Sequence, residues 1–384
     1  MRSLKTLFTF FAILMIGAGS LDAQSEDRVV KLMEELTNAP GPSGFEGPVR
    51  QVVERELRAL GASISHDGLG SVIGEVKGPN GGPRIMVTAH MDEVGLMVQH
   101  IRSDGFLRFK KLGGWFDQAL VDQRWTIVTK SGPLLGVSGL RTIHVTPREV
   151  RNRVWPLEDL FIDVGARSRE EAEAMGIRPG DPIAPWSPFT VLGENRYAAK
   201  AWDDRAGLVV MIEALRLIKE EDLTIPGDLF FVATVQEEIG LRGGGTSTRR
   251  VRPDLGISIE GGVSADYPGA RPEQAQERLG MGPGIFLMDS SMIPNQKLRD
   301  FFFEVARQEG IPLQPNVLTG YGEDGAEIQR YDSGRPAVNI TVPARYLHSH
   351  TGIIDRGDLD GAVKLLIAVL ERLDRVTVKE LSSF

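Results

Sequence analysis

From about residue 198 the chain alternates apolar strands with helices, and the first of these helices is apolar on nearly every side. At 204–219, residues such as Leu208, Met211 and Leu215 are spread around the whole helix and leave little polar face. A helix of this kind must pack against other elements on several sides. Strands are expected around it at 228–235, 255–259 and 337–342, and helices at 297–308 and 359–373. We therefore predict an α/β fold in which a mixed, mostly parallel sheet is sandwiched by helices.

The first hundred residues follow the same pattern, but the middle of the chain does not. Helices are expected at 27–37 and 45–60, followed by strands at 71–76, 84–88 and 93–100. Residues 101–188 instead contain short strand-like runs, many Gly and Pro turns, and one short helix at 169–174. We therefore predict a discontinuous main domain, residues 24–100 and 189–384, interrupted by a small β-rich domain at 101–188.

Composition narrows the classes of protein and of site. The chain has 384 residues, 41% hydrophobic and 25% charged, which is typical of globular proteins. Its net charge of -8 argues against a nucleic-acid binder. The absence of cysteine excludes disulfides, thiolate zinc sites, iron–sulfur clusters and a cysteine nucleophile. Any metal must therefore be bound by His, Asp or Glu, and the chain has only six histidines.

The first residues read as an export signal. Arg2 and Lys5 form a short basic region, and the uncharged run at 6–21 is shorter than the ~20 apolar residues that span a membrane. Small residues follow, and Ala23 is the expected cleavage point. We predict a signal peptide at 1–23, an extracytoplasmic location (periplasmic or secreted) and no membrane attachment after cleavage. The alternative is a buried N-terminal helix or an uncleaved anchor.

Two of the expected elements begin or end with residues suited to a metal site. The strand at 84–88 runs directly into His90, and Asp92 points to the same side of an extended chain. This pair suits a histidine ligand oriented by a carboxylate, although a surface turn gives the same pattern. Asp203 and Asp204 open the apolar helix, where acids are also favoured simply as caps.

Further acids and histidines follow the later strands. Glu237 and Glu238 are adjacent after an apolar strand, which is unfavourable unless one of them binds a cation or holds a proton. A solvated pair of loop acids is the alternative. Glu260 ends the next strand. His348 and His350 come late in the chain, and each of them could be a ligand or simply a surface histidine.

Each of these signals is weak alone, but together they form one inventory. Histidines and carboxylates lie at successive strand ends, where α/β proteins build their sites, and no cysteine accompanies them. This set of ligands suits a two-metal hydrolytic site with nitrogen and oxygen donors. Zn²⁺ or Co²⁺ matches such donors better than Mg²⁺ does.

The order and spacing of these motifs resemble the glutamyl and deblocking aminopeptidases, also called the tetrahedral aminopeptidase family. The resemblance runs from about Val29 to Leu373 and includes the β-rich insertion. Its motifs are His90-Met91-Asp92-Glu93-Val94-Gly95, Ala201-Trp202-Asp203-Asp204-Arg205, Gln236-Glu237-Glu238-Ile239-Gly240, Glu260 and Arg345-Tyr346-Leu347-His348-Ser349. It implies a dinuclear zinc peptidase-like fold whose main domain is catalytic, and a metal-dependent release of N-terminal amino acids from peptides.

Carried over residue by residue, the resemblance also implies a metal site. Two divalent ions, Zn²⁺ or alternatively Co²⁺, would be bound by His90, Asp203, Glu238, Glu260 and His348. Asp203 would bridge the two ions, with Glu238 on one and His348 on the other. Homo-oligomers are implied as well, with a dodecamer as one assembly.

The resemblance implies two catalytic residues and one unusual peptide bond. Asp92 would orient His90, and Glu237 would be the general base that takes a proton from water and returns it to the leaving amine. The bond after Asp203 would be cis, which would free Asp204 to hydrogen-bond around His90.

The chain departs from the family pattern at three places. Glu260 stands where relatives usually have Asp and is one methylene longer. Relatives usually carry Thr before the Asp of the Gly-rich stretch at 320–325, which resembles part of the wall of the substrate pocket. His350 stands where relatives often carry Pro, and we expect it not to be a ligand.

Three other functions remain as alternatives. A glycoside hydrolase can also use paired carboxylates, but it needs no cluster of His and Asp ligands. Another metal-dependent amidohydrolase, such as a carboxypeptidase, is the nearest enzyme alternative, and a non-catalytic binding protein on the same scaffold is the third. Loss of activity on chelation would favour the peptidase over the glycosidase.

Overall fold

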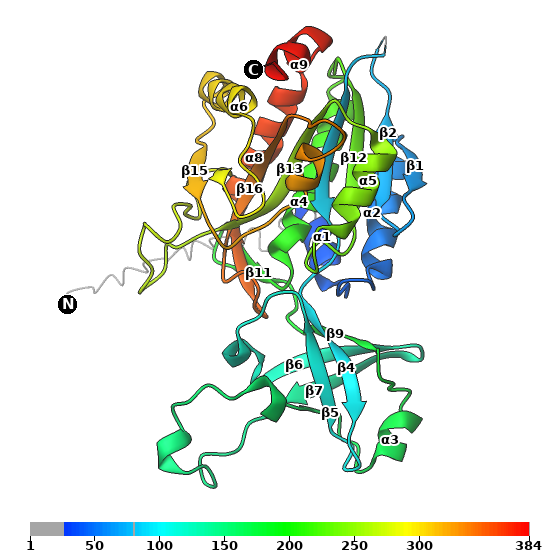
Figure 1. Cartoon of the computed structure of the whole chain (residues 1–384), viewed down its shortest axis with the longest axis vertical. Helices are drawn as coiled ribbons and strands as arrows, with labels where there is room; N and C mark the ends of the chain where they lie inside the picture. The colour runs from blue at the N-terminus through cyan, green and yellow to red at the C-terminus, as the bar shows by residue number, and fades with distance from the viewer. Residues whose placement is uncertain (1–26, 80, 384) are drawn as a thin grey trace, which may run out of the picture.

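The computed structural model describes residues 27–79 and 81–383, so the predicted signal peptide at 1–23 lies outside the described residues. These residues form a large body of helices around a sheet, with a small barrel at one end (Figure 1). Within the same ranges, the helices are all too short or too polar to cross a lipid bilayer.

The large sheet at the centre of the body is mixed, as predicted. Its strands follow the order β1-β2-β12-β3-β13-β16-β17-β11-β10, and β14 and β15 join beside β16. The neighbours β12, β3, β13 and β16 run parallel, and β14 and β15 are parallel to each other, whereas β1, β2, β10, β11 and β17 pair antiparallel with their neighbours. The strands are β1 (Ser63–His66), β2 (Val72–Val76), β3 (Arg84–His90), β10 (Thr190–Leu192), β11 (Arg196–Ala199), β12 (Asp228–Thr234), β13 (Leu255–Val263), β14 (Gly284–Met288), β15 (Gln314–Val317), β16 (Ala337–Arg345) and β17 (Gly352–Asp355).

Helices cover both faces of this sheet, which confirms the predicted sandwich. Because successive side chains of a strand point to opposite faces, Ile85 and Val87 pack in one core with α4, while Met86 packs in a second core with α5 and α7. The apolar helix α4 is buried along most of its length. The helices are α1 (Arg28–Asn38), α2 (Gly47–Ala59), α4 (Trp202–Glu220), α5 (Arg242–Val251), α6 (Gln296–Glu309), α7 (Gly325–Gln329), α8 (Arg356–Leu370) and α9 (Arg375–Leu381).

The β-rich segment closes into a barrel with its own apolar core. Its strands follow the order β4-β5-β8-β7-β6-β9 around the barrel. They are β4 (Gly95–Ile101), β5 (Leu107–Leu112), β6 (Gln123–Thr129), β7 (Gly132–Ser138), β8 (Ile162–Asp163) and β9 (Pro182–Pro185), with the short helices η1 (Asp117–Leu120), η2 (Arg148–Val150), η3 (Leu157–Asp159) and α3 (Arg169–Ala174) between them. The division of the chain into domains at residues 101 and 188 stays a prediction.

The helices α5, α7 and α9 were not expected from the sequence, and α5 lies beside the site. Three glycines, 243–245, disfavour a helix, yet they lie in the first turn of α5. A side chain at Gly244 would overlap the carboxylate of Asp324, and one at Gly243 would overlap the carbonyl of Val235. The glycines therefore allow α5 to pack closely against the end of β12, beside the site described next.

Candidate active site

The predicted site residues meet at one edge of the sheet. Parallel strands end at the same edge, and β3 ends in His90 while Glu260 lies towards the end of β13. The acid pair Glu237 and Glu238 follows β12, and Asp203 lies at the start of α4. These segments are far apart in the sequence, and only the order of the strands in the sheet brings them together.

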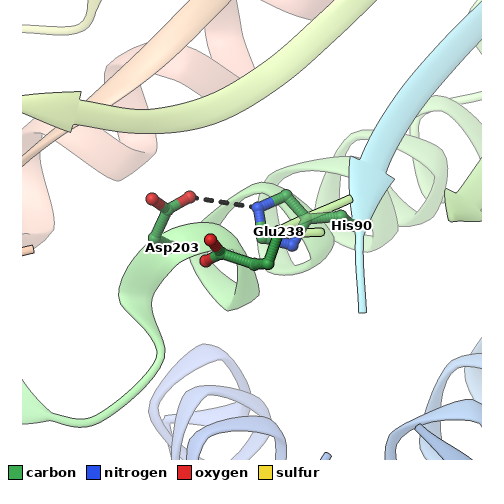
Figure 2. A group of neighbouring side chains, drawn as sticks. All are labelled: His90, Asp203 and Glu238. Atoms are coloured by element: carbon green, nitrogen blue, oxygen red, sulfur yellow. Dashed lines mark hydrogen bonds and ion pairs between the residues drawn. The ribbon is translucent and has the colours of Figure 1, made fainter. Parts of the chain in front are cut away.

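Asp203 lies between the two predicted histidine ligands. Its Oδ1 is 3.1 Å from His90 Nε2, and its Oδ2 is 3.3 Å from His348 Nε2. Glu238 Oε2 is 3.4 Å from His348 Nε2, and Glu260 Oε2 is 3.9 Å from His90 Nε2. All five predicted ligands are therefore in one cluster, with Glu238 on the same side as His348 (Figure 2 shows His90, Asp203 and Glu238).

The ligand atoms form two groups that could each hold a cation. Within the described residues, His90, Asp203 and Glu238 form one such group, and His90, Asp204 and Glu260 form the other, each with its atoms within 4.8 Å of one another. Glu238 Oε1 and Glu260 Oε2 are buried and have no hydrogen-bond partner. Buried carboxylate oxygens of this kind are costly unless a cation or proton satisfies them.

The two histidines differ in exposure. His90 is 1% exposed, whereas the side chain of His348 is 37% exposed. His90 Nδ1 lies 3.0 Å from the carbonyl oxygen of Asp92, and His348 Nδ1 lies 2.9 Å from the carbonyl oxygen of Gly114. Each ring thus presents Nε2 to the cluster, because a main-chain carbonyl accepts the proton of its other nitrogen.

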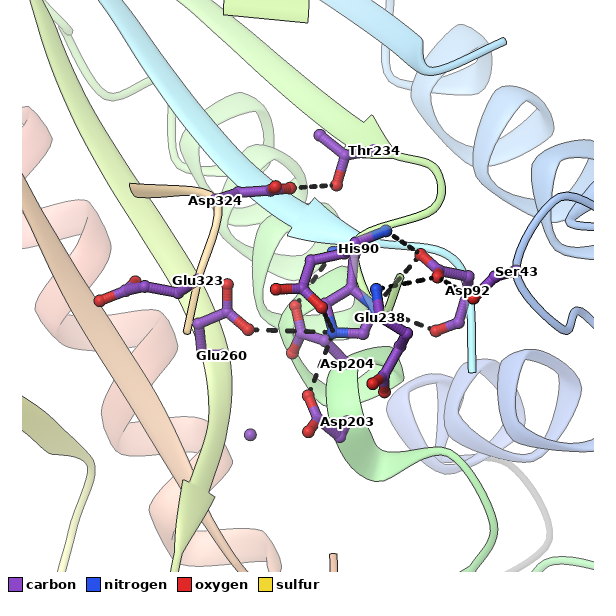
Figure 3. Close-up of polar contacts among 12 residues, drawn as sticks. Ser43, His90, Asp92, Asp203, Asp204, Thr234, Glu238, Glu260, Glu323 and Asp324 are labelled. Atoms are coloured by element: carbon purple, nitrogen blue, oxygen red, sulfur yellow. Dashed lines mark hydrogen bonds and ion pairs between the residues drawn. The ribbon is translucent and has the colours of Figure 1, made fainter. Parts of the chain in front are cut away.

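The carboxylate of Asp92 holds the acid pair rather than the ring of His90. Its oxygens accept hydrogen bonds from the amides of Glu237 at 2.9 Å and Glu238 at 3.1 Å, and from Ser43 Oγ at 2.6 Å (Figure 3). The nearest distance from this carboxylate to His90 Nδ1 is 3.7 Å. Asp92 therefore fixes the turn that carries Glu237 and Glu238 next to His90.

Burial and crowding of like charges control protonation in the cluster. Burial raises the pKa of Glu237 well above its ordinary value, and the adjacent Glu238 carboxylate raises it further. Burial also raises the pKa of Glu238, to about 7. The pKa of Asp203 shifts the other way. Burial alone would raise it, but hydrogen bonds from His348 and His90 lower it below its ordinary value. The site therefore combines two carboxyls that hold their protons to higher pH than usual with one, Asp203, that ionises more readily than usual.

The predicted cis peptide bond between Asp203 and Asp204 is confirmed. Asp204 Oδ1 accepts a hydrogen bond from the amide of Gly207 at 2.9 Å, and Oδ2 accepts one from the amide of His90 at 3.2 Å. The two adjacent acids thus have different tasks. Asp203 faces the histidines, while Asp204 ties the start of α4 to the end of β3.

A buried ion cluster behind the site was missed by sequence reasoning. Lys200 Nζ donates to both oxygens of Glu93, at 2.6 and 2.8 Å, and Arg205 lies 3.6 Å from the same carboxylate. Arg205 Nε also donates to the carbonyl of Met91 at 2.9 Å. Each member is close in sequence to His90 or Asp203, so the cluster joins the two segments that carry them. Its only sequence signal was that Glu93 and Arg205 lie within the motifs and that Lys200 directly precedes one of them.

The Gly-rich stretch that departs from the family pattern lies against the site. Glu323 is fully buried, and its Oε1 accepts a hydrogen bond from Asn339 Nδ2 at 2.7 Å. Asp324 accepts a hydrogen bond from Thr234, the last residue of β12 (Figure 3). Tyr321 donates its hydroxyl proton to the carbonyl of Gly261, at 2.9 Å. This stretch therefore forms one wall beside the ends of β12 and β13.

Comparison with known proteins identifies the family. The family model of the M42 glutamyl aminopeptidases matches residues 70–365. The chain belongs to this family. It is 38% identical to the lysyl aminopeptidase of Pyrococcus furiosus, over 89% of this chain and 97% of that one. It is 33% identical to the glutamyl aminopeptidase of Lactococcus lactis, over 92% of this chain and 98% of that one. The chain is therefore an aminopeptidase-type hydrolase.

Solved structures of the family agree with the fold. The TET aminopeptidase from a marine sediment archaeon of the Thaumarchaeota has a TM-score of 0.90 and 40% identity, covering 92% of this chain and 99% of that one. The TET1 peptidase of Pyrococcus horikoshii, which can assemble into a tetrahedron or a large octahedral shell, has a TM-score of 0.80 and 33% identity, covering 89% of this chain and 99% of that one.

The prediction of an extracytoplasmic location is wrong by the same comparison. The matches span 97% of the P. furiosus protein and 98% of the L. lactis protein. The part of each relative that lies outside the match is therefore shorter than the leader predicted at 1–23. The apolar run at 6–21 led to this prediction because it has the length and flanking charges of an export signal.

Proposed function

We propose that this M42 protein is a metal-dependent aminopeptidase that releases N-terminal amino acids from peptides with two divalent cations. The observation that carries the proposal is the position of Asp203, whose two carboxylate oxygens face two different histidines at 3.1 and 3.3 Å. A carboxylate that bridges two cations needs this arrangement. His90 and Glu260 would complete one site. His348 and Glu238 would complete the other, because Glu238 Oε2 lies 3.4 Å from His348 Nε2. This differs from the division expected from the resemblance, which put Glu238 and His348 on different ions.

The donor set fits such a pair of cations. Two imidazoles and three carboxylates, without cysteine, match Zn²⁺, with Co²⁺ as the alternative. The unpartnered oxygens of Glu238 and Glu260 would each gain a ligand bond. The extra methylene of Glu260 is accommodated, since its Oε1 accepts a hydrogen bond from Ser258 Oγ at 2.9 Å and Oε2 stays free.

The chemistry divides between the cations and the residues of the chain. Bound divalent cations lower the pKa of a water molecule towards neutrality and polarise the scissile carbonyl. Glu237 lies 3.8 Å from His90 Nε2 and would take the proton of that water and deliver it to the leaving amine. Burial raises the pKa of this carboxyl, so it is a stronger base towards the water proton than an exposed glutamate. Asp92 keeps Glu237 in place through its amide.

The substrates would be peptides with a free N-terminal amine. A cluster rich in buried carboxylates attracts an ammonium group and so places the first peptide bond at the cations. The relatives include a lysyl and a glutamyl aminopeptidase at similar identity, so the preferred side chain cannot be carried over. The glycosidase alternative is disfavoured, because that mechanism needs two carboxyl groups and gives His90 and His348 no task.

We further propose that the chain forms a homo-oligomer. The support is the similarity to the P. horikoshii protein, whose chains assemble into closed shells. A dodecamer is one such assembly. Sedimentation of the purified protein would distinguish it from a monomer of 42.1 kDa.

Metal stoichiometry and turnover test the main proposal together. Protein saturated with Zn²⁺ or Co²⁺ and freed of excess metal should contain close to two ions per chain. A panel of aminoacyl amides should be hydrolysed by the loaded protein and not after chelation. A stoichiometry near zero, or undiminished hydrolysis in the presence of chelator, would reject the proposal.

A further inference from the structure

The loop that carries His348 has an irregular backbone. It connects β16 to β17, and two of its residues, Tyr346 and His348, have left-handed backbone with φ of 59° and 54°. Residues other than glycine rarely adopt this conformation unless neighbouring contacts hold them there. His348 cannot supply those contacts through burial, since its side chain is 37% exposed.

The next histidine in this loop is buried in the barrel. His350 is 7% exposed, and its ring lies edge-on against Trp125, with centroids 4.2 Å apart and planes at 77°. The ring of Trp115 lies on another side of it at 5.7 Å. His350 Nε2 donates to the carbonyl of Arg124 at 3.1 Å. The imidazole thus occupies an aromatic slot formed by the barrel, with one hydrogen bond at its end.

The same barrel segment contacts both histidines. Gly114, whose carbonyl accepts from His348 Nδ1, is adjacent in sequence to Trp115, which packs on His350. The loop is therefore attached to the barrel at two points two residues apart, one through the proposed ligand and one through His350. Docking of His350 restricts how His348 can move relative to Asp203.

We propose that His350 is a positioning residue, which fixes His348 for one of the two cations by docking its loop in the barrel. This inference rests on the proposed function. It predicts an asymmetric effect, because His90 is held by β3 and Asp204 and makes no use of the slot. Loss of His350 should weaken the cation at His348 and leave the cation at His90 nearly unchanged.

Titration of metal-stripped protein with Co²⁺, followed by its visible absorption, separates the two sites. Wild type should bind two equivalents. His350→Ala should bind the first with unchanged affinity and the second at least about tenfold more weakly. His350→Phe keeps a ring between the tryptophans and should recover most of that loss. His100→Ala, which removes an exposed histidine of the barrel, should behave as wild type.

Each outcome has one reading. If wild type binds no Co²⁺, the proposed function fails, and this inference fails with it. If wild type binds two equivalents and both variants at His350 do the same with unchanged affinity, only the positioning role is overturned. It is also overturned if the variants weaken both equivalents equally, since that indicates general destabilisation. Should His350→Ala fail to fold, His350→Leu, which fills part of the slot without a ring, replaces it. Selective weakening of the second equivalent supports the inference, and unchanged affinity for both equivalents, or equal weakening of both, overturns it.

Discussion

The barrel buries different kinds of residue from the body that contains the large sheet. In the barrel, the buried side chains of the described residues are apolar apart from a few hydroxyls, such as Ser138 bonded to Trp125. The body instead buries many charged groups, including His90, Asp204 and Glu260. The barrel can therefore be stabilised by apolar burial alone, whereas the body must offset the desolvation of its charges.

This difference shows where function costs stability. Most buried charges of the body lie at the strand ends near the site, where they would bind cations, or are paired as Lys200 and Glu93 are. The barrel carries none of these ligands, yet its Gly114 carbonyl and its tryptophan slot touch the loop of His348. The comparison predicts that changes in the body alter activity, charge balance and pH dependence, while changes in the barrel core away from the slot for His350 alter stability alone.

The largest expected effect is on turnover. Glu237→Gln should lower kcat by about 10²–10⁴-fold and keep two bound metals, because it removes a base and not a ligand. Hydrolysis rates on aminoacyl amides measure the turnover, and elemental analysis measures the number of bound metals. Glu238→Gln is the matched variant and should lose metal affinity as well. Near-native turnover of Glu237→Gln would remove it from the proposed mechanism.

Next in size is the buried ion cluster. Glu93→Gln leaves Lys200 and Arg205 as two buried cations without their anion and should cost roughly 3–5 kcal/mol of unfolding free energy. The double variant with Lys200→Met removes one of these charges and should recover part of that loss. Denaturant unfolding measures both.

The exposed pair Arg102–Asp104 provides the control for this cluster. Both side chains are about half exposed, so Asp104→Asn should change stability far less than Glu93→Gln does. A double variant at Lys200 and Glu93 less stable than Glu93→Gln alone would show that packing, rather than charge, dominates at this position.

A third effect depends on pH. Burial raises the pKa of Glu277 to about 8 from an ordinary 4.5, and its carboxyl accepts from Thr341 Oγ1 at 2.8 Å. Between these values the native state keeps a proton that the unfolded state has released, so stability should fall by about 1.4 kcal/mol per pH unit and level off above pH 8. Glu277→Gln should remove this slope.

Unfolding free energies between pH 5 and 9, measured with chelator present so that metal binding adds no pH dependence, test this prediction. The variant should gain on wild type steadily as the pH rises. Glu380→Gln, at an exposed position, is the control and should track wild type. Parallel curves for wild type and Glu277→Gln would contradict it.

Sequence reasoning located the ligand types but not the contacts that orient them. His90 and Glu260 could be predicted because apolar strands run straight into them, and the sandwich followed from the periodicity of the strands and helices. Asp92 was expected to orient His90, yet its carboxylate holds the amides of Glu237 and Glu238. Contacts of this kind depend on the order of the strands in the sheet, and the hydrophobic pattern of the sequence does not reveal that order. For the same reason, nothing in the local sequence linked His350 to Trp125.

The smallest effect tests the barrel side of the comparison. Ile162 of β8 is fully buried in the barrel core, and Ile340 of β16 is fully buried in the body. Ile→Val removes one methylene at either position and should cost about 0.5–1.5 kcal/mol. The loss from Ile162→Val should be independent of pH, since the barrel core buries no charge. At temperatures well below unfolding, this variant should also keep wild-type turnover and both equivalents of Co²⁺. A selective loss of the second equivalent in Ile162→Val would show that the barrel core itself, and not only the slot for His350, controls the geometry at His348.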